Sequence, residues 1–362
     1  MNIQDGSAAP ARAMQFERGV FTGNAKEYFG IWIVNVLLTI ITLGIYSAWA
    51  KVRRNRYFYG NTQLLGRAFE YHATGKQIFI GRLIVFVAVI VLNIAAALVP
   101  VLAIVIPLVF LAAFPWLIKR SLRFNARVTS YRNVRFDFVG GMGGAFLAFI
   151  VGGLLAFITL GILAPLASRW SYKYIFNNLR YGDRPFSADP ALGALYRQWL
   201  VPVLMVVLGG VILGVIGLSL SGFFTTMLDD IGDETNFQIA LIAMIYLALF
   251  GVIIVYGLAG LIYRAGVRNV AWSSAKLDGK HEMMSDLSRL RYAWIAISNI
   301  VITILTLGLM RPWAAVREAR YVTEHSAIRF DGDVGAVMSS IESSGSAISA
   351  EYMDMEGFDF GF

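Results

Sequence analysis

The sequence has no cysteine and few of the residues that carry charge or bind metals. Of its 362 residues, 57% are hydrophobic, 15% are charged and three are histidine. The absence of cysteine excludes disulfides, zinc–thiolate sites, iron–sulfur clusters and cysteine nucleophiles. Soluble domains are about half apolar and about a quarter charged. The composition therefore predicts a polytopic membrane protein.

Motifs for catalysis are equally scarce. None of His72, His281 and His325 has a second histidine three or four residues away, so no helix carries a paired metal-binding motif. No nucleophile elbow, Walker loop or dinucleotide glycine pattern occurs. The apolar segments also lack the ionisable residues that proton-driven carriers place in the membrane. We expect no cofactor, no metal site and no enzymatic activity.

Long apolar segments divide the chain. Six stretches hold no charged residue: Tyr28–Ala50, Leu83–Ile118, Val139–Ser168, Gln198–Leu228, Thr235–Tyr263 and Tyr292–Met310. A spanning helix needs about 20 apolar residues. Leu83–Ile118 is too long for one helix, and Pro100 and Pro107 favour a turn near its middle. The stretches thus give seven apolar segments.

The charges between these segments indicate an orientation. Lys and Arg dominate the four regions 51–82, 119–137, 169–197 and 264–291, whereas Asp229, Asp230, Asp233 and Glu234 form a loop without a base. The positive-inside rule places the basic regions in the cytoplasm, so the net charge of +8 is a topology signal and does not indicate nucleic-acid binding. All four regions stay inside if only four segments cross: two within 83–118, one near 199–221 and one near 238–263. Seven full spans are the alternative.

The three segments that need not cross share an internal repeat. Thr42-Leu43-Gly44, Thr159-Leu160-Gly161 and Thr306-Leu307-Gly308 each end an apolar run. The residues that follow agree in register, which is typical of a repeat. The aligned positions are Trp49, Arg53, Arg56 and Tyr57 in the first copy, Trp170, Lys173 and Tyr174 in the second, and Trp313, Arg317, Arg320 and Tyr321 in the third.

The repeat has the properties of a helix at the membrane interface. Trp49, Arg53 and Arg56 are spaced to share a helix face, and aromatic and cationic residues favour the headgroup region. Gly44, Gly161 and Gly308 would let the chain turn back, so each segment would be re-entrant or kinked. The aligned residues are therefore candidate contacts for anionic lipid headgroups. Simple anchoring and packing is the alternative role.

Turn residues and spaced aromatic residues follow each basic helix. Gly60-Asn61-Thr62 precedes Phe69, Tyr131-Arg132-Asn133 precedes Phe136, and Tyr181-Gly182-Asp183 precedes Phe186. Such patterns are typical of short hairpins. The expected fold is an all-α polytopic helix bundle with three repeated Thr-Leu-Gly helical segments and short cytoplasmic β-hairpin-like loops.

These features divide the chain into five regions. They are an N-terminal cytoplasmic segment (1–27), a first repeat with a helical pair at 83–118 (28–137), a second repeat with spans near 199–221 and 238–263 (138–291), a partial third repeat (292–332) and an acidic tail (333–362). The tail holds six acids and no base. It could dock on the basic regions of the protein, recruit a protein partner or remain solvated.

The repeat also resembles a known family. Thr42-Leu43-Gly44-Ile45-Tyr46, Trp49, Arg53, Tyr57, Gly60-Asn61-Thr62 and Phe69-Glu70-Tyr71 are similar to the YjgN family of bacterial inner-membrane proteins, from about Phe21 to Asp331. The resemblance implies a multi-pass protein of the bacterial inner membrane. It implies no activity, because the family is a domain of unknown function. The second copy departs from the pattern, with Leu166 and Trp170 where the others have tryptophan and arginine.

Two functions are compatible with these features. The first is transport or binding of a small or amphipathic molecule through the helix bundle, with the lipid bilayer as partner. The alternative is a membrane scaffold that organises a partner complex through its basic regions and its acidic tail.

Overall fold

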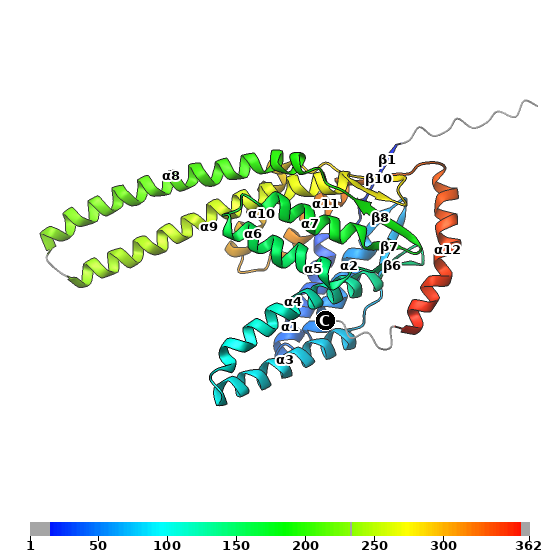
Figure 1. Cartoon of the computed structure of the whole chain (residues 1–362), viewed down its shortest axis with the longest axis horizontal. Coiled ribbons are helices and arrows are strands. Elements are labelled where there is room, and N and C mark those ends of the chain that lie inside the picture. Colours follow the sequence, from blue (N-terminus) through cyan, green and yellow to red (C-terminus); the bar gives the residue numbers. More distant parts are fainter. Residues whose placement is uncertain (1–14, 232–233, 356–362) are drawn as a thin grey trace, which may run out of the picture.

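The computed structural model describes residues 15–231 and 234–355. They form five modules, each a pair of antiparallel helices with a short β-hairpin, and a C-terminal helix. In the first four modules the hairpin follows the helices, whereas in the fifth one of its strands comes from the N-terminal segment. The helices in modules 1, 3 and 5 are short and those in modules 2 and 4 are long (Figure 1). Residues 28, 138 and 292, where the sequence suggested boundaries, lie close to the first helices of modules 1, 3 and 5.

The modules follow one another along the chain. Module 1 is α1 (Ala25–Ile41), α2 (Ser47–Asn61), β3 (Thr62–Leu64) and β4 (Arg67–Tyr71). Module 2 is α3 (Gly75–Leu98), α4 (Leu102–Arg127), β5 (Thr129–Tyr131) and β6 (Val134–Phe138). Module 3 is α5 (Met142–Ala145), the π-helical turn η1 (Phe146–Val151), α6 (Gly152–Ile158), α7 (Ala164–Asn177), β7 (Leu179–Tyr181) and β8 (Arg184–Ala188).

Modules 4 and 5 complete the arrangement. Module 4 is α8 (Leu192–Ile231), α9 (Glu234–Ser273), β9 (Ala275–Leu277) and β10 (His281–Ser285). Module 5 is α10 (Arg289–Leu305), α11 (Arg311–Glu324) and β11 (Ser326–Arg329), and its second strand is the N-terminal segment β1 (Phe16–Arg18) and β2 (Val20–Phe21). The last helix is α12 (Val334–Met355).

The strands form one antiparallel sheet that is closed almost into a barrel. Their order is β1-β11-β10-β9-β8-β7-β6-β5-β4-β3-β2, so each hairpin pairs with the next one along the chain. The N-terminal segment closes the ring, because β1 pairs with β11 and β2 pairs with β3 on the two sides of Gly19. A Cβ at Gly19 would lie 2.9 Å from the Thr323 carbonyl oxygen, so only glycine fits this junction.

The expectation of an all-α fold is therefore wrong. The described chain is mostly helical, but its short hairpins join one eleven-stranded sheet instead of standing as separate loops. Pairs such as Phe69 with Tyr131 and Phe136 with Tyr181 join strands of different modules. The strands are only two to five residues long, so local sequence shows the turns but not these distant partners.

Four of the described helices are long and apolar enough to cross a membrane: Gly75–Leu98, Leu102–Arg127, Leu192–Phe223 and Leu241–Ser273. The four expected spans overlap these helices. In the most apolar 18-residue stretch of each helix, at most 11% of the residues are buried. Their side chains therefore face outward, where lipid would solvate them. Pro100 lies in the turn between α3 and α4, and Pro107 lies within α4.

The three Thr-Leu-Gly segments turn back after short helices. In each copy leucine has a φ near +50° and glycine a φ near +90°, and the glycine N–H donates to the carbonyl five residues earlier at 2.7 Å. This bond closes the first helix. The threonine hydroxyl accepts the N–H of the residue four positions later, which is the N-cap residue of the second helix, and so holds the turn closed.

The turns of these short hairpins expose apolar side chains. Leu43, Leu160 and Leu307 at the three tips are 94%, 82% and 95% exposed. The 17 residues of α1 extend about 25 Å, less than the roughly 30 Å of a bilayer core. The Trp199 indole in α8 donates to the Gly161 carbonyl at 2.8 Å, so the tip of module 3 lies beside the first turns of a spanning helix.

Figure 1 shows how these parts are arranged. The pairs α3–α4 and α8–α9 extend away from the sheet, and α12 lies at the opposite end of the molecule from the tips of α8 and α9. Met338 and Ile341 of α12 are each 2% exposed and belong to the core inside the sheet. The helix α12 therefore covers the end of the barrel that faces away from the spanning helices.

Candidate functional site

The barrel contains a partly open cavity of about 550 Å³. Its walls come from strands of all five modules, from the C-terminal ends of α7, α9 and α11, and from α12. The lining is dominated by aromatic and aliphatic side chains: Leu64, Phe69, Tyr131, Phe136, Tyr172, Ile175, Phe176, Leu179, Tyr181, Phe186, Trp272, Leu277, Met283, Val322, Ala327, Ile328, Phe330 and Met338. Such size and composition are typical of a small-molecule site.

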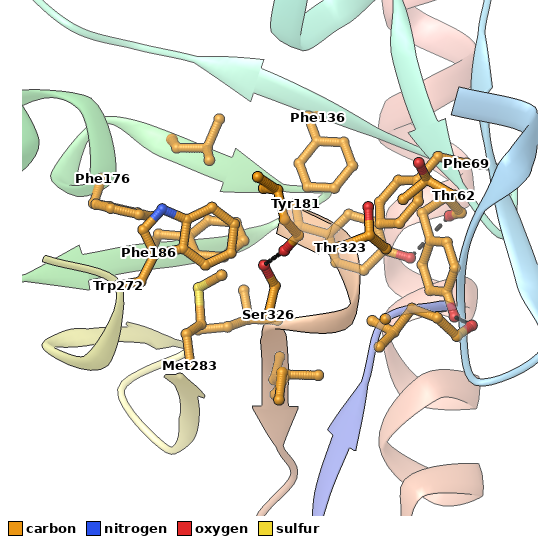
Figure 2. Close-up of a pocket in the computed structure, with 18 of the residues that line it drawn as sticks. Thr62, Phe69, Phe136, Phe176, Tyr181, Phe186, Trp272, Met283, Thr323 and Ser326 are labelled. Carbon is orange, nitrogen blue, oxygen red and sulfur yellow. Dashed lines mark hydrogen bonds between the residues drawn. The ribbon is translucent and has the colours of Figure 1, made fainter. Parts of the chain in front are cut away.

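Equivalent positions in the modules build this wall. Leu64, Tyr131, Tyr181, Leu277 and Ile328 occupy one strand position, and Phe69, Phe136 and Phe186 occupy another. Successive rings are in contact, with centroid distances of 4.9 Å for both Phe69–Tyr131 and Phe136–Tyr181. In Figure 2, Phe136, Phe186, Trp272 and Met283 surround a common space. The internal repeat therefore produces a continuous aromatic belt.

The tyrosines of the belt present their rings and not their hydroxyl groups. The Tyr131 hydroxyl donates to the Leu64 carbonyl at 2.6 Å, and the Tyr181 hydroxyl donates to the Tyr131 carbonyl at 2.8 Å. Burial raises the pKa of both phenols above its ordinary value, so both stay neutral. Because each hydroxyl is bonded to the backbone, this part of the wall is apolar.

One cation stands at the edge of this apolar wall. The Arg268 guanidinium in α9 donates to the hydroxyls of Ser285 and Ser326, the latter at 2.9 Å. Its Cζ atom lies 4.4 Å from the centre of the Trp272 ring, a cation–π arrangement. Gln63, Thr62 and Thr323 add uncharged polar groups. The cavity thus combines a large apolar volume with a small polar corner.

Polar contacts hold α12 against the barrel. Arg132 pairs with Glu342 at 3.3 Å, and the Arg184 guanidinium donates to the Ser340 hydroxyl at 3.3 Å. Docking on basic residues, one of the three roles left open for the acidic tail, agrees with the Arg132–Glu342 pair. Residues 356–362 lie outside the described residues.

The residues predicted to face lipid headgroups in module 1 contact the protein itself. The Arg53 guanidinium donates to the Asn35 side chain at 3.3 Å, and Arg56 donates to the Ala73 carbonyl at 3.2 Å. The Tyr57 hydroxyl accepts the N–H of Asn24, the residue that caps α1, at 2.7 Å. Trp49 is 37% exposed and packs on Phe79.

Module 5 repeats this arrangement. Arg317 donates to Asn299 at 3.3 Å and stacks over Trp313 at 5.1 Å. Arg320 donates to the Gly23 carbonyl at 2.9 Å, and the Tyr321 hydroxyl accepts the N–H of Ser288 at 2.9 Å. In module 3, the Tyr174 hydroxyl donates to Gly141 at 2.9 Å, Lys173 pairs with Asp189 at 3.2 Å, and Trp170 packs in a buried cluster.

The tyrosines and the cations have structural roles in these contacts. Each tyrosine ties the last turn of a helical pair to the start of the first helix of the same pair, so both ends of the pair lie together. Arg56, Arg320 and Lys173 reach the end of the hairpin that follows the helical pair. Arg53 and Arg317 instead reach Asn35 and Asn299 on the first helix of the pair. No observation tests their predicted contact with lipid headgroups, which stays a prediction.

Module 5 also forms a polar pocket of about 510 Å³. Arg291, Arg317 and Arg320 line it together with Trp294, Trp313 and Glu324, which gives two more positive than negative charges. Arg291 and Trp294 were not among the predicted contacts. They lie on α10, whereas the repeat pattern was recognised on α11.

The sequence signal for module 2 was missed. Trp116, Arg120 and Arg123 precede β5 at the same spacing at which Trp49, Arg53 and Arg56 precede β3. Arg120 stacks over Trp116 at 5.4 Å, as Arg317 does over Trp313. Module 2 has no Thr-Leu-Gly turn, so an alignment anchored on that turn does not find it. The spaced aromatics Phe69, Phe136 and Phe186 were recognised, but their shared cavity was not.

Comparison with known proteins gives the family. Residues 16–355 match the family described as bacterial proteins of unknown function, DUF898. The chain belongs to this family. No significant match to a solved structure was found.

The curated relatives carry one name. The inner membrane protein YjgN of Escherichia coli O157:H7 is 41% identical over 120 residues, which are 33% of this chain and 30% of that protein. YjgN of Escherichia coli strain K12 is 41% identical and YjgN of Salmonella typhimurium strain LT2 is 42% identical, over the same shares. The matched part thus spans about 30% of the length of these relatives.

The comparisons confirm the predicted family and location. Together with the four helices long enough to span, they identify a multi-pass, YjgN-like inner-membrane protein embedded in the lipid bilayer. They assign it no activity.

Proposed function

We propose that the protein binds one apolar or amphipathic small molecule inside its barrel and that the helical hairpins hold this site at the membrane surface. The supporting observation is the apolar cavity of about 550 Å³ with its aromatic belt. Apolar surface of this extent gains free energy when it is covered, at about 25 cal/mol per Å². A ligand with an alkyl or ring portion supplies that cover.

The arrangement of the spanning helices favours binding over passage across the membrane. Figure 1 shows α3–α4 and α8–α9 as two pairs that extend separately from the barrel. The apolar side chains of these helices are exposed and do not enclose a common channel. The protein therefore holds or hands over its ligand on one side of the bilayer, and by the positive-inside rule that side is the cytoplasm.

The site is proposed to bind without chemical turnover. Among its described lining residues there is no Asp, Glu, His or Lys that could act as a general acid or base. Arg268 keeps its proton at physiological pH and is suited to binding a charge.

Anionic lipids are the proposed membrane partners. The pocket formed by Arg291, Arg317 and Arg320 lies beside Trp294 and Trp313, the combination that favours headgroup contact. Replacing Arg291 and Arg317 by glutamine should lower the anionic lipid that copurifies. Unchanged lipid would restrict these arginines to contacts within the protein.

Binding is tested with a neutral alkyl probe. Deuterated dodecanol is titrated into the full-length protein in phosphatidylcholine nanodiscs, and uptake by protein-free nanodiscs is subtracted. Met283→Trp fills the cavity and should weaken binding about tenfold or more. Met284→Trp is the matched control, because Met284 is the next residue on β10 and does not line the cavity.

The outcomes separate the proposed function from its rival. Saturable binding that only Met283→Trp removes supports the proposal. Absence of saturable binding in the unmodified protein would remove it. A scaffold would instead be indicated by one abundant partner in native-membrane crosslinking that both methionine variants retain.

A further inference from the structure

The cavity holds a cation that has no carboxylate partner in the described part of the chain. Three other arginines of the barrel, Arg184, Arg132 and Arg18, pair with acids at 3.0, 3.3 and 2.6 Å. Arg268 contacts neutral partners, namely two serine hydroxyls and the Trp272 ring. A cation next to an apolar wall is costly unless an anion compensates it.

The hydroxyls beside Arg268 are already oriented by other bonds. The Ser285 hydroxyl donates to the Asn269 side-chain oxygen at 2.8 Å, and the Ser326 hydroxyl donates to the Val322 carbonyl at 2.6 Å. Each serine oxygen therefore presents its lone pairs to the guanidinium and holds it in place. These two bonds use two of the five N–H donors of the guanidinium, and Arg268 also lines the cavity.

We propose that the ligand is an acidic amphipath with a single chain, whose carboxylate or phosphate head binds Arg268 and whose alkyl tail occupies the aromatic belt. This inference rests on the proposed function and names the class of ligand that the site binds. Arginine binds carboxylates and phosphates through paired charge-assisted hydrogen bonds. The belt around Phe136 and Phe186 supplies no charge, so the head has one place to bind and the tail takes the rest.

The test compares probes with the same tail and different heads. Dodecanoic acid, dodecyl phosphate and dodecanol are titrated into the full-length protein in phosphatidylcholine nanodiscs at neutral pH, each corrected with protein-free nanodiscs. At least one of the two acids should bind about tenfold more tightly than the alcohol. The stronger of the two identifies the head.

Arginine variants locate the head. Arg268→Gln should bring the acids to the affinity of the alcohol, whereas Arg268→Lys should keep part of the preference. Arg264→Gln is the matched control, because Arg264 lies one turn earlier on α9, is exposed and does not line the cavity. It should leave the preference unchanged.

The outcomes distinguish this inference from the proposed function. Equal binding of acids and alcohol by the unmodified protein would overturn the inference and leave the proposed function standing, even if Arg268→Gln does not fold. A preference that survives in folded Arg268→Gln would also overturn it. Binding of none of the probes would remove both proposals.

Discussion

The spanning helices and the barrel use apolar residues in opposite directions. In the most apolar 18-residue stretches of α8 and α9 no residue is buried. Leu218 is 76% exposed and Ile253 is 68% exposed. In the barrel, Val134 and Tyr181 are 0% and 3% exposed and surround or support the cavity. Lipid would cover the first surface, whereas neighbouring strands and helices cover most of the second. Apolar composition therefore indicates a membrane protein but does not reveal the second apolar region, which lies inside the barrel.

The largest expected effect concerns which hairpins cross the membrane. Single cysteines at Thr226 in α8 and Ser187 in β8 introduce the only thiols of the chain. Thr226 lies 34 residues into α8, about 50 Å along the helix and beyond a bilayer core of roughly 30 Å. An impermeant thiol reagent outside intact cells, with any outer membrane permeabilised, should label Thr226→Cys fully and Ser187→Cys not at all. Labelling at position 187 would place the barrel outside.

The helix that covers the barrel provides the second contrast. Met338→Asp places a charge in the apolar end of the cavity and should weaken dodecanol binding about tenfold, because α12 then loses its apolar contact. Ser339→Asp adds the same charge at the exposed neighbouring position and should bind like the unmodified protein. An equal loss of dodecanol binding in both variants would show that binding depends on the charge of α12 and not on how α12 covers the cavity.

The short hairpins depend on their turns. Gly308 has a φ of +90°, so Gly308→Ala should lower the free energy of unfolding by about 1–2 kcal/mol. Gly30→Ala is the control, since Gly30 lies within α1 with open space around it and alanine favours helix there. Thermal unfolding in detergent measures both. Equal effects would show that the positive φ does not define the turn.

The smallest effect is a pH dependence at the barrel. Burial lowers the pKa of His281, whose Nδ1 accepts the Asp331 N–H at 3.0 Å before α12 begins. As the pH falls, the unfolded state therefore binds a proton before the folded state does. His281 contributes stability that is present above the unfolded pKa of about 6.5 and is lost as the pH falls below that value. Thermal unfolding between pH 8 and 5 should show this slope, and His281→Gln should reduce it. An identical slope in the variant would assign it to other groups.

Local sequence predicted the membrane part well because its signals are local. Runs of apolar residues, basic flanks and Thr42-Leu43-Gly44 each occur within a few residues and specify helices and turns directly. The barrel depends on pairs such as Phe69 with Tyr131, 62 residues apart, between strands too short to show a clear period. Arg268 was counted only as one charge among the basic flanks, because its place in a cavity wall follows from the closed sheet.

The most direct test of the central claim is what the protein carries when it is isolated. Full-length protein, Met283→Trp and Met284→Trp are purified in parallel from membranes, extracted with organic solvent and analysed by mass spectrometry against equal amounts of bulk lipid. We predict one bound molecule per chain with an alkyl or ring portion, present in the unmodified protein and in Met284→Trp and lost from Met283→Trp. The account would be contradicted if all three samples contained the same bulk lipids and no molecule were missing from Met283→Trp.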